Sequence, residues 1–334
     1  MKNIVLCFDR VRDHPGPRDA TNAAALLRLL DESDAQLTWY HPGTPVPVHS
    51  NVDRLRWRRS AAEEARATIA EAYEFLVDNW DSGDRIYLFG VGRGAYCAHA
   101  LTRLLGTVGL LPDLMDYVLA TYAVPRTHRD PQDWTRLTTL TARLTGRREI
   151  EVPVQYLGLW DMISVPGGHP SAVPLTNVVD GRHAVAIDGR LGGSHLVSPP
   201  DCVEEVWFRG AHCDIAGGPG ACWPLADIAL DWVLDGAVRA GVAVRAASQS
   251  DAPAPTECDA LAGSARTFSL RRPPADALVH ASVDIYLRAH PEYWRRLPDR
   301  VVWADVDWLA RSERLVQTKP AAPARQAEFA AAAS

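Results

Sequence analysis

A glycine-flanked turn stands between an apolar run and a helix-forming segment within residues 85–96. The turn reads Gly90-Val91-Gly92-Arg93-Gly94. Its spacing is that of the G-x-S-x-G nucleophile elbow, in which a strained strand-to-helix turn presents a serine hydroxyl above a parallel sheet. In this chain glycine occupies the position of that serine, at Gly92. The motif therefore predicts the scaffold of a serine hydrolase without its nucleophile.

Two more residues complete the order nucleophile, acid, histidine that α/β hydrolases follow along the chain. Asp161 ends the apolar run 157–160, and His212 comes just after the run 203–209. In such a site the aspartate holds the imidazole in one tautomer, while the imidazole takes the proton of the nucleophile. The structural alternatives are that Asp161 forms a turn or helix cap and that His212 is an ordinary hydrogen-bonded loop residue.

The same glycines also fit a dinucleotide-binding pattern, Gly90-x-Gly92-x-x-Ala95. Glycines between a strand and a helix let a pyrophosphate approach the backbone. That function needs an acidic residue at the end of a second strand about 20 residues further on. The corresponding segment, 106–111, is apolar. The sequence therefore favours the hydrolase scaffold, and we expect no cofactor.

Strand and helix patterns alternate along the chain, as they do in a mostly parallel sheet with helices on both faces. Apolar runs predict strands that are covered on both faces, at 4–8, 36–40, 86–89, 152–160 and 203–209. Helical spacing and caps predict helices at 22–30, behind a capping box at Ser60, at 95–105 and at 225–240. The predicted fold class is α/β, of the α/β-hydrolase-like kind.

We expect one domain over residues 1–317. The predicted additions to its central sheet are a helical cap over the sheet edge at 112–148, a polar surface loop at 246–258 and a C-terminal helical extension at 259–317. A proline- and glycine-rich loop is predicted at 165–182. Residues 318–334 are rich in alanine, and this biased composition predicts a disordered tail.

The composition restricts the partners and the compartment. The 334 residues are 47% hydrophobic and carry a net charge of -6 without a lysine or arginine block, which argues against a nucleic-acid partner. No run reaches the roughly 18 apolar residues of a transmembrane segment, and the first apolar run is too short for a signal peptide. Six cysteines without a CxxC pair indicate reduced thiols, and His212-Cys213-Asp214 lacks metal-ligand spacing. We therefore expect a cytoplasmic protein without a metal.

Several segments match a known family in the same order along the chain. They are Cys7-Phe8-Asp9 with Thr21-Asn22, 72–77, 83–98 around the glycine turn, 156–163, 183–188, 206–218 and 225–233. Together they resemble the DUF2235 family, the α/β-hydrolase group that includes the catalytic domain of Tle1-type phospholipase effectors of type VI secretion. The resemblance extends over about residues 3–290.

The resemblance implies an ester or phospholipid substrate and a serine-type site. Asp161 and His212 would be the acid and the base, while Gly92 stands at the nucleophile position without a hydroxyl. The oxyanion hole would use backbone amides of Arg93 and of the loop at Arg10, where the family's Gly-Thr is replaced by Arg10-Val11. Three further aspartates are expected to contribute to binding: Asp9, Asp188 and Asp214.

Three functions are compatible with the sequence. The first is a hydrolase-family protein with impaired or absent ester hydrolysis, whose ligand is a small-molecule or lipid-like ester. The second is a ligand-binding or regulatory protein that has lost the chemistry. The third is an enzyme in which the His212–Asp161 pair activates water or a substrate hydroxyl directly. Ester hydrolysis that His212→Ala abolishes would select the third. The sequence does not identify a protein partner.

Overall fold

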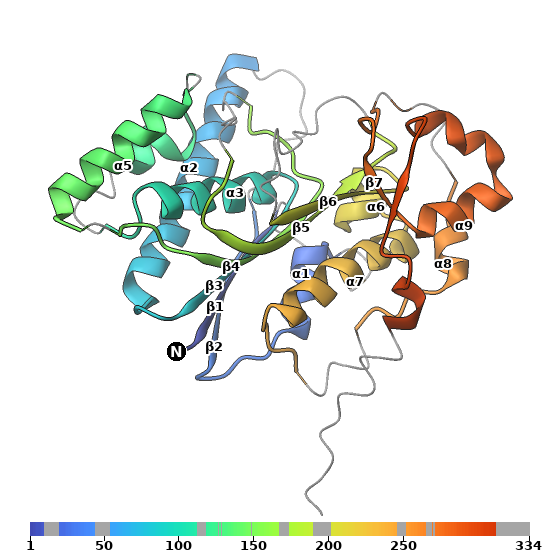
Figure 1. The fold of residues 1–334 in the computed structure, drawn as a ribbon, viewed down its shortest axis with the longest axis horizontal. Helices are drawn as coiled ribbons and strands as arrows, with labels where there is room; N and C mark the ends of the chain where they lie inside the picture. The colour runs from blue at the N-terminus through green and yellow to red at the C-terminus, as the bar shows by residue number, and fades with distance from the viewer. Residues whose placement is uncertain are drawn as a thin grey trace, which may run out of the picture.

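Within the described part of the chain, this computed structural model contains one sheet of eight strands with helices on both faces (Figure 1). The structure describes residues 1–9, 20–43, 54–111, 118–125, 127, 129–147, 149–166, 174–189, 202–245, 252–264, 269 and 271–311. Neighbouring strands of the sheet are parallel throughout these ranges. The predicted α/β fold class is therefore confirmed.

The order of the strands in the sheet is β2-β1-β3-β4-β5-β6-β7-β8. Their bounds are β1 Asn3–Phe8, β2 Gln36–His41, β3 Arg85–Val91, β4 Val154–Trp160, β5 Val178–Ala186, β6 Val203–Phe208, β7 Leu278–His280 and β8 Val302–Ala304. The direction of winding reverses between β1 and β3. Open α/β sheets place their ligand sites at the carboxyl ends of the strands around such a reversal.

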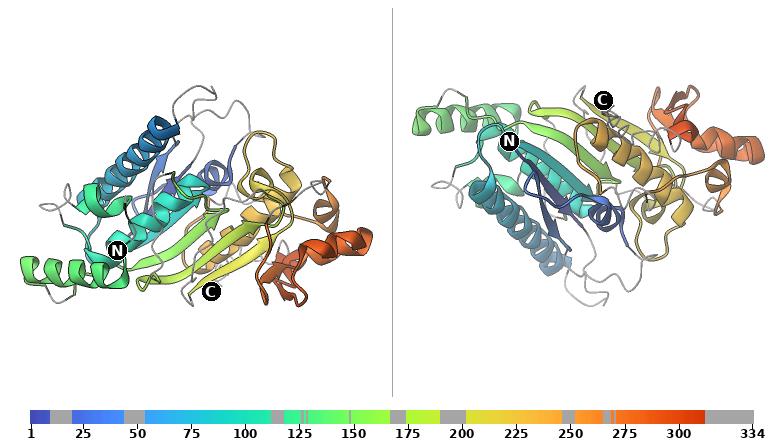
Figure 2. Two further views of the ribbon diagram at one scale, coloured as in Figure 1. Left: turned by 90° about the horizontal axis from the view of Figure 1, so that it is seen from above. Right: turned by 90° about the horizontal axis from the view of Figure 1, so that it is seen from below.

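Helices pack on the two faces of the sheet in separate groups (Figure 2). The helices are α1 Asn22–Leu29, α2 Arg54–Asn79, α3 Arg93–Thr107, α5 Pro131–Thr145, α6 His212–Ala216, α7 Trp223–Arg239, α8 Glu257–Leu261 and α9 Ser282–Ala289, with a π-helix η3 Leu119–Ala123 and 3-10 helices η5 Pro291–Arg296 and η6 Trp308–Ala310. None of the helices in the described ranges combines the length and the apolar character needed to span a bilayer.

Strand β1 explains why both faces are covered. Ile4 and Leu6 belong to the core under α2 and α3, whereas Val5 and Cys7 belong to the core under α1 and α7. Because successive side chains of a strand point to opposite faces, an unbroken apolar run needs helices on both sides. The apolar sequence of this strand therefore matches its position inside the sheet.

The segment predicted as a cap at 112–148 is helical at η3 and α5, but it packs against α2 and α3. The Trp134 ring of α5 lies 5.4 Å from the Arg103 guanidinium, near the C-terminal end of α3. Arg103 is ten residues beyond the first residue of α3, or about 15 Å along the helix axis. Helix α5 therefore lies away from the Gly92 turn, and the cap over the sheet edge stays a prediction.

The start of α2, β5 and α8 differs from the sequence prediction. Helix α2 starts at Arg54, so Ser60 lies inside it and donates to Glu64 (3.1 Å) instead of capping. Strand β5 begins at Val178, inside the predicted loop 165–182, because pairing with β4 extends it beyond its most apolar part. Helix α8 begins at Glu257, inside the predicted loop 246–258. In the first two cases a local signal of a few residues gives way to helix propagation or strand pairing. Helix α8 instead begins at a local signal, where the Asp259 side chain accepts the Thr256 N–H (2.7 Å).

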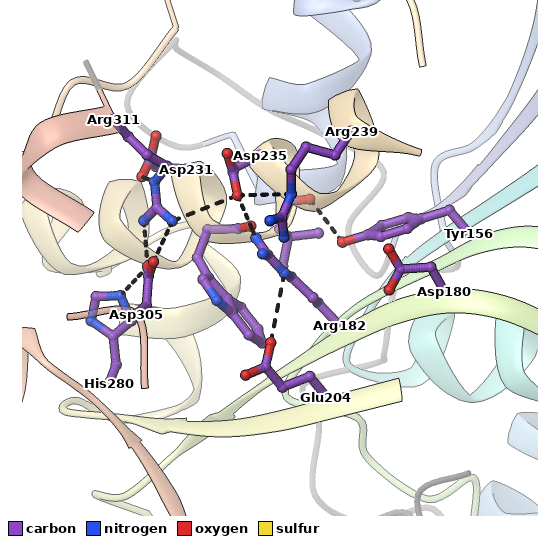
Figure 3. Close-up of polar contacts among 12 residues, drawn as sticks. Tyr156, Asp180, Arg182, Glu204, Asp231, Asp235, Arg239, His280, Asp305 and Arg311 are labelled. Carbon is purple, nitrogen blue, oxygen red and sulfur yellow. Dashed lines mark hydrogen bonds and ion pairs between the residues drawn. The ribbon is translucent and has the colours of Figure 1, made fainter. Parts of the chain in front are cut away.

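The C-terminal extension contributes strands as well as helices. Strands β7 and β8 continue the sheet beyond β6, where the sequence predicts helices alone. A buried ion-pair cluster ties this extension to α7 (Figure 3). Arg311 contacts Asp231 (2.8 Å), Asp305 (2.5 Å) and Asp235 (3.8 Å), and His280 contacts Asp305 (3.0 Å). The predicted tail at 318–334 lies outside the described residues.

Candidate active site

The glycine turn has the backbone shape of a nucleophile elbow. Gly92 joins β3 to α3 with φ 58° and ψ −110°, in the left-handed half of backbone space that favours glycine. A Cβ on Gly90 would lie 2.5 Å from the Cα of Ala95, and one on Gly94 would lie 2.6 Å from the carbonyl carbon of Phe8. The flanking glycines are therefore required because backbone passes too close for a side chain.

Backbone hydrogen bonds place the turn beside the end of β4. The Gly92 N–H donates to the Trp160 carbonyl (2.9 Å), and the Ile163 N–H donates to the Gly92 carbonyl (2.9 Å). Asp161 lies between these two partners in the chain. The position of the missing nucleophile and the predicted acid are therefore neighbours at the carboxyl edge of the sheet.

Asp161 and His212 form the predicted hydrogen bond. The Nδ1 atom of His212 lies 2.7 Å from the Oδ2 atom of Asp161. Asp161 is 1% exposed and has φ 43°, a left-handed conformation that aspartate tolerates better than most residues. The Nε2 atom of His212 is buried and has no hydrogen-bond partner among the described residues. This is the nitrogen that would take a proton in a serine hydrolase.

An arginine that the sequence analysis does not identify binds the acid. Arg271 contacts Asp161 through both terminal nitrogens, Nη1 to Oδ1 (2.5 Å) and Nη2 to Oδ2 (3.2 Å). The Ala186 N–H also donates to Oδ1 (3.0 Å). Burial alone would raise the pKa of Asp161, but the hydrogen bond and charge of His212 and the charge of Arg271 lower that pKa well below its ordinary value. Asp161 is therefore held as a carboxylate.

A second histidine fixes the residue after the acid. His183 is 1% exposed, and its Nε2 accepts the Met162 N–H (3.2 Å) while Nδ1 lies 3.0 Å from Glu205. Because Nε2 is an acceptor here, the proton of the neutral ring is on Nδ1, facing the carboxylate. The sequence shows His183 only as part of a segment matching the family. Its role in the site depends on the pairing of β5 with β4 and β6.

Asp9 and Asp214, two of the three predicted binding aspartates, accept hydrogen bonds from other groups of the protein. Asp9 follows β1 and accepts hydrogen bonds from Thr21 (2.5 Å) and Tyr40 (2.7 Å). Asp214 lies in α6 and accepts the Ala211 N–H (2.8 Å) through Oδ2, so it supports the backbone just before His212. A direct contribution of these two carboxylates to ligand binding stays a prediction.

The third predicted binding aspartate, Asp188, is completely buried. Its Oδ2 accepts the Gly210 N–H (3.1 Å) and the Tyr293 hydroxyl (3.0 Å), and its Oδ1 pairs with Arg296. Through these contacts Asp188 joins the end of β5 to the loop before His212 and to the C-terminal extension. A direct contribution of Asp188 to ligand binding also stays a prediction.

Of the two predicted oxyanion-hole positions, Arg93 lies within the described residues. Arg93 is the first residue of α3, and first-turn N–H groups have no acceptor within their own helix. Its amide is therefore in the place where an oxyanion donor belongs in this kind of site. Arg10 lies outside the described residues. No group of three or more potential metal-binding side chains occurs among the residues described.

Comparison with known proteins identifies the family. Residues 2–236 match the family model described as type VI secretion system, phospholipase effector Tle1-like, catalytic domain. The chain belongs to this family. The resemblance found in the sequence is thereby confirmed, and the Tle1-like domain occupies the part of the chain that contains Gly92, Asp161 and His212.

The individual relatives match only part of this Tle1-like chain, and the chain matches only part of each relative. An uncharacterized protein of Saccharomyces cerevisiae is 31% identical over 215 residues, which are 57% of this chain and 32% of that protein. A crystal structure of an uncharacterized protein from Pseudomonas aeruginosa is 15% identical, with a TM-score of 0.43 over 73% of this chain and 46% of the other. The Tle1 effector bound to the VgrG spike is 16% identical, with a TM-score of 0.38 over 65% and 51%. The chain thus spans about a third of the yeast relative and about half of each of these structures.

Arg271 lies outside the stretch that matches the family model. It is 110 residues from Asp161 in the chain, within the polar, proline-containing segment 269–274. That segment shows neither helical nor strand periodicity, and nothing in its local sequence indicates a site residue. Only the fold brings the arginine to the acid.

Proposed function

We propose that this Tle1-like domain binds a lipid-like ester at the family's site and does not cleave it through an acyl-enzyme. The observation that carries the proposal is Gly92, which has the backbone of the elbow and no hydroxyl. Serine hydrolysis begins with attack by that hydroxyl. Removing the nucleophile of a serine hydrolase lowers turnover roughly a million-fold.

Retention of the rest of the site supports binding over complete loss of function. Asp161 keeps its hydrogen bond to His212 and its ion pair with Arg271, although both Asp161 and Arg271 are buried. Buried charges that are not needed for packing tend to be replaceable by apolar residues at little cost. The preserved arrangement is therefore consistent with a site that still recognises a ligand.

The test compares the unmodified protein with His212→Ala. We expect neither fluorophosphonate labelling nor release of p-nitrophenol from p-nitrophenyl butyrate above the His212→Ala background, because fluorophosphonates react with an activated serine and an acyl-enzyme forms on one. Binding is measured by calorimetry with dihexanoyl phosphatidylcholine below its micelle concentration. We expect saturable binding that leaves the lipid intact, as checked by mass spectrometry. Absence of binding, or cleavage of the lipid, would refute the proposal.

A second candidate function is general-base catalysis by the Asp161–His212 pair. The observation that favours it is the buried Nε2 of His212, which has no acceptor or donor partner among the described residues. An imidazole in this state can take a proton from water or from a substrate hydroxyl, a contribution of about 10²–10⁴-fold.

Activated esters distinguish this candidate from the first. General-base catalysis predicts turnover of p-nitrophenyl acetate that falls to background in both His212→Ala and Asp161→Asn, with no fluorophosphonate labelling. Equal rates in the parent and both variants would exclude it.

A further inference from the structure

The C-terminal extension reaches the site from outside the family-matched stretch. We propose that Arg271 is a positioning residue that orients the Asp161 carboxylate toward His212, and that the extension is therefore a working part of the site. The inference rests on the proposed function only in taking the Asp161–His212 pair as the part of the site that is retained.

The hydrogen bonds of Asp161 leave its carboxylate one orientation. Oδ1 accepts from the Ala186 N–H (3.0 Å) and from Nη1 of Arg271 (2.5 Å), and Oδ2 accepts from Nη2 of Arg271 (3.2 Å). These contacts leave Oδ2 with its remaining lone pair toward His212, at 2.7 Å. A planar guanidinium that binds both oxygens fixes the plane of a carboxylate in a way that a single donor does not.

The segment that carries Arg271 is docked on the end of β5. The Ser269 hydroxyl donates to the Ile187 carbonyl (2.9 Å) and accepts the Gly189 N–H (3.1 Å). Nη1 of Arg271 also donates to the Ala186 carbonyl (3.0 Å). The guanidinium is therefore attached to the same strand end whose amide binds Asp161, and its position follows that of the strand.

The same extension holds the loop of the base. Tyr293 and Arg296, both in η5, bind the buried Asp188. Asp188 in turn makes two hydrogen bonds with the backbone of Gly210. Its N–H donates to the Gly210 carbonyl (2.9 Å), and its side-chain Oδ2 accepts the Gly210 N–H (3.1 Å). Gly210 is two residues before His212. Residues of the extension therefore position both members of the pair.

The test uses the Nδ1–H proton of His212 in protein labelled with nitrogen-15 at histidine. We expect a low-field, exchange-protected resonance in the parent, assigned by its absence in His212→Ala. Arg271→Gln should accelerate exchange of this proton by ~10-fold or more, the factor expected on weakening one charge-assisted hydrogen bond. Arg271→Lys, which retains the charge, should restore part of the protection.

Matched variants separate positioning from a general loss of structure. Arg288→Gln removes an exposed arginine of the same extension, paired only with Asp284 of its own helix as far as the described contacts show, and should leave the resonance unchanged. Gly189→Ala keeps the guanidinium but places a Cβ 2.9 Å from Nε of Arg271, so it should shift the resonance and accelerate exchange. Circular dichroism checks the fold of each variant.

Each outcome decides the inference. A folded Arg271→Gln with the parental resonance and exchange rate would overturn it. If Arg271→Gln does not fold, Gly189→Ala decides, and a parental spectrum for that variant would overturn it equally. Ester cleavage by the parent would refute the proposed function without changing these spectra, so the two failures are distinguishable.

Discussion

Replacing Gly92 with serine restores the missing hydroxyl and introduces backbone strain. Gly92 has φ 58° and ψ −110°, a region that residues with a Cβ occupy at a cost of about 1–3 kcal/mol. Glycine pays no such penalty. The new hydroxyl, if it reaches the unpartnered Nε2 of His212, recovers about 0.5–1.5 kcal/mol from one hydrogen bond. We expect Gly92→Ser to lower the free energy of unfolding by about 1 kcal/mol or slightly more.

Alanine at the same position separates the two effects. Gly92→Ala has the strain without the hydroxyl, so it should be less stable than Gly92→Ser by about 1 kcal/mol. The control is Gly146, the C-cap of α5, which has φ 65° and no atom within 4 Å of a Cβ built on it. Serine and alanine at Gly146 should cost about the same, because the described residues place no atom within 4 Å of the new Cβ apart from the chain neighbours.

Urea unfolding measures these differences as shifts of the midpoint at constant slope. Thermal unfolding should show a decrease of about 1–2 °C per kcal/mol for a chain of this size. A Gly92→Ser variant as stable as the parent, or more stable, would refute the argument from strain. Equal stability of the serine and alanine variants would refute the placement of the hydroxyl next to His212.

Three further predictions concern the frame around the site. Gly94→Ala should lower the free energy of unfolding by about 3 kcal/mol, since its Cβ would meet the backbone of Phe8; urea unfolding with an unchanged stability would contradict this. Arg311→Ala should cost about 3–5 kcal/mol because it removes the arginine that pairs with the buried Asp231 and with Asp305, whereas Arg239→Ala, with a side chain 63% exposed, should cost about 0–1 kcal/mol; equal losses would refute the distinction. Burial opposes the shift, but the hydrogen bond of His280 and the charge of Arg311 lower the pKa of Asp305 from 3.8 to about 2. Because this pKa is lower in the folded state, Asp305 contributes stability that is present above its unfolded pKa and is lost as the pH falls from there through about 2; Asp305→Asn should flatten the pH dependence of unfolding in that window, and an unchanged slope would contradict the assignment.

The sequence by itself determined the local geometry of the site. The elbow can be recognised from the spacing of its glycines, and the steric requirement at Gly90 is local because a Cβ there would meet Ala95. The requirement at Gly94 is set by Phe8 of β1 and is not local in the sequence. Asp161 and His212 are recognisable because each directly follows an apolar run, and parallel strands bring their carboxyl ends to one edge of the sheet. The two side chains meet at that edge, where Nδ1 of His212 lies 2.7 Å from Oδ2 of Asp161.

Local signals were insufficient where elements compete for the same residues. The capping pattern at Ser60 lies inside α2, and the amino end of β5 lies in a segment that looks like a loop. Helix propagation and strand pairing involve more residues than a capping motif does, so they prevail over it. The packing of α5 and η3 against α3 likewise depends on contacts that the amphipathic pattern of this segment does not specify.

The tertiary structure alone decided what surrounds the acid. Arg271 lies 110 residues from Asp161, and Tyr293 lies 105 residues from Asp188. Such pairs require the extension to lie against the end of β5, with β7 and β8 in the sheet. A buried carboxylate requires a counter-charge, but the requirement is met in space and can be met from any point of the chain. For that reason the sequence predicts the acid and the base, whereas only the fold identifies the arginine that holds them.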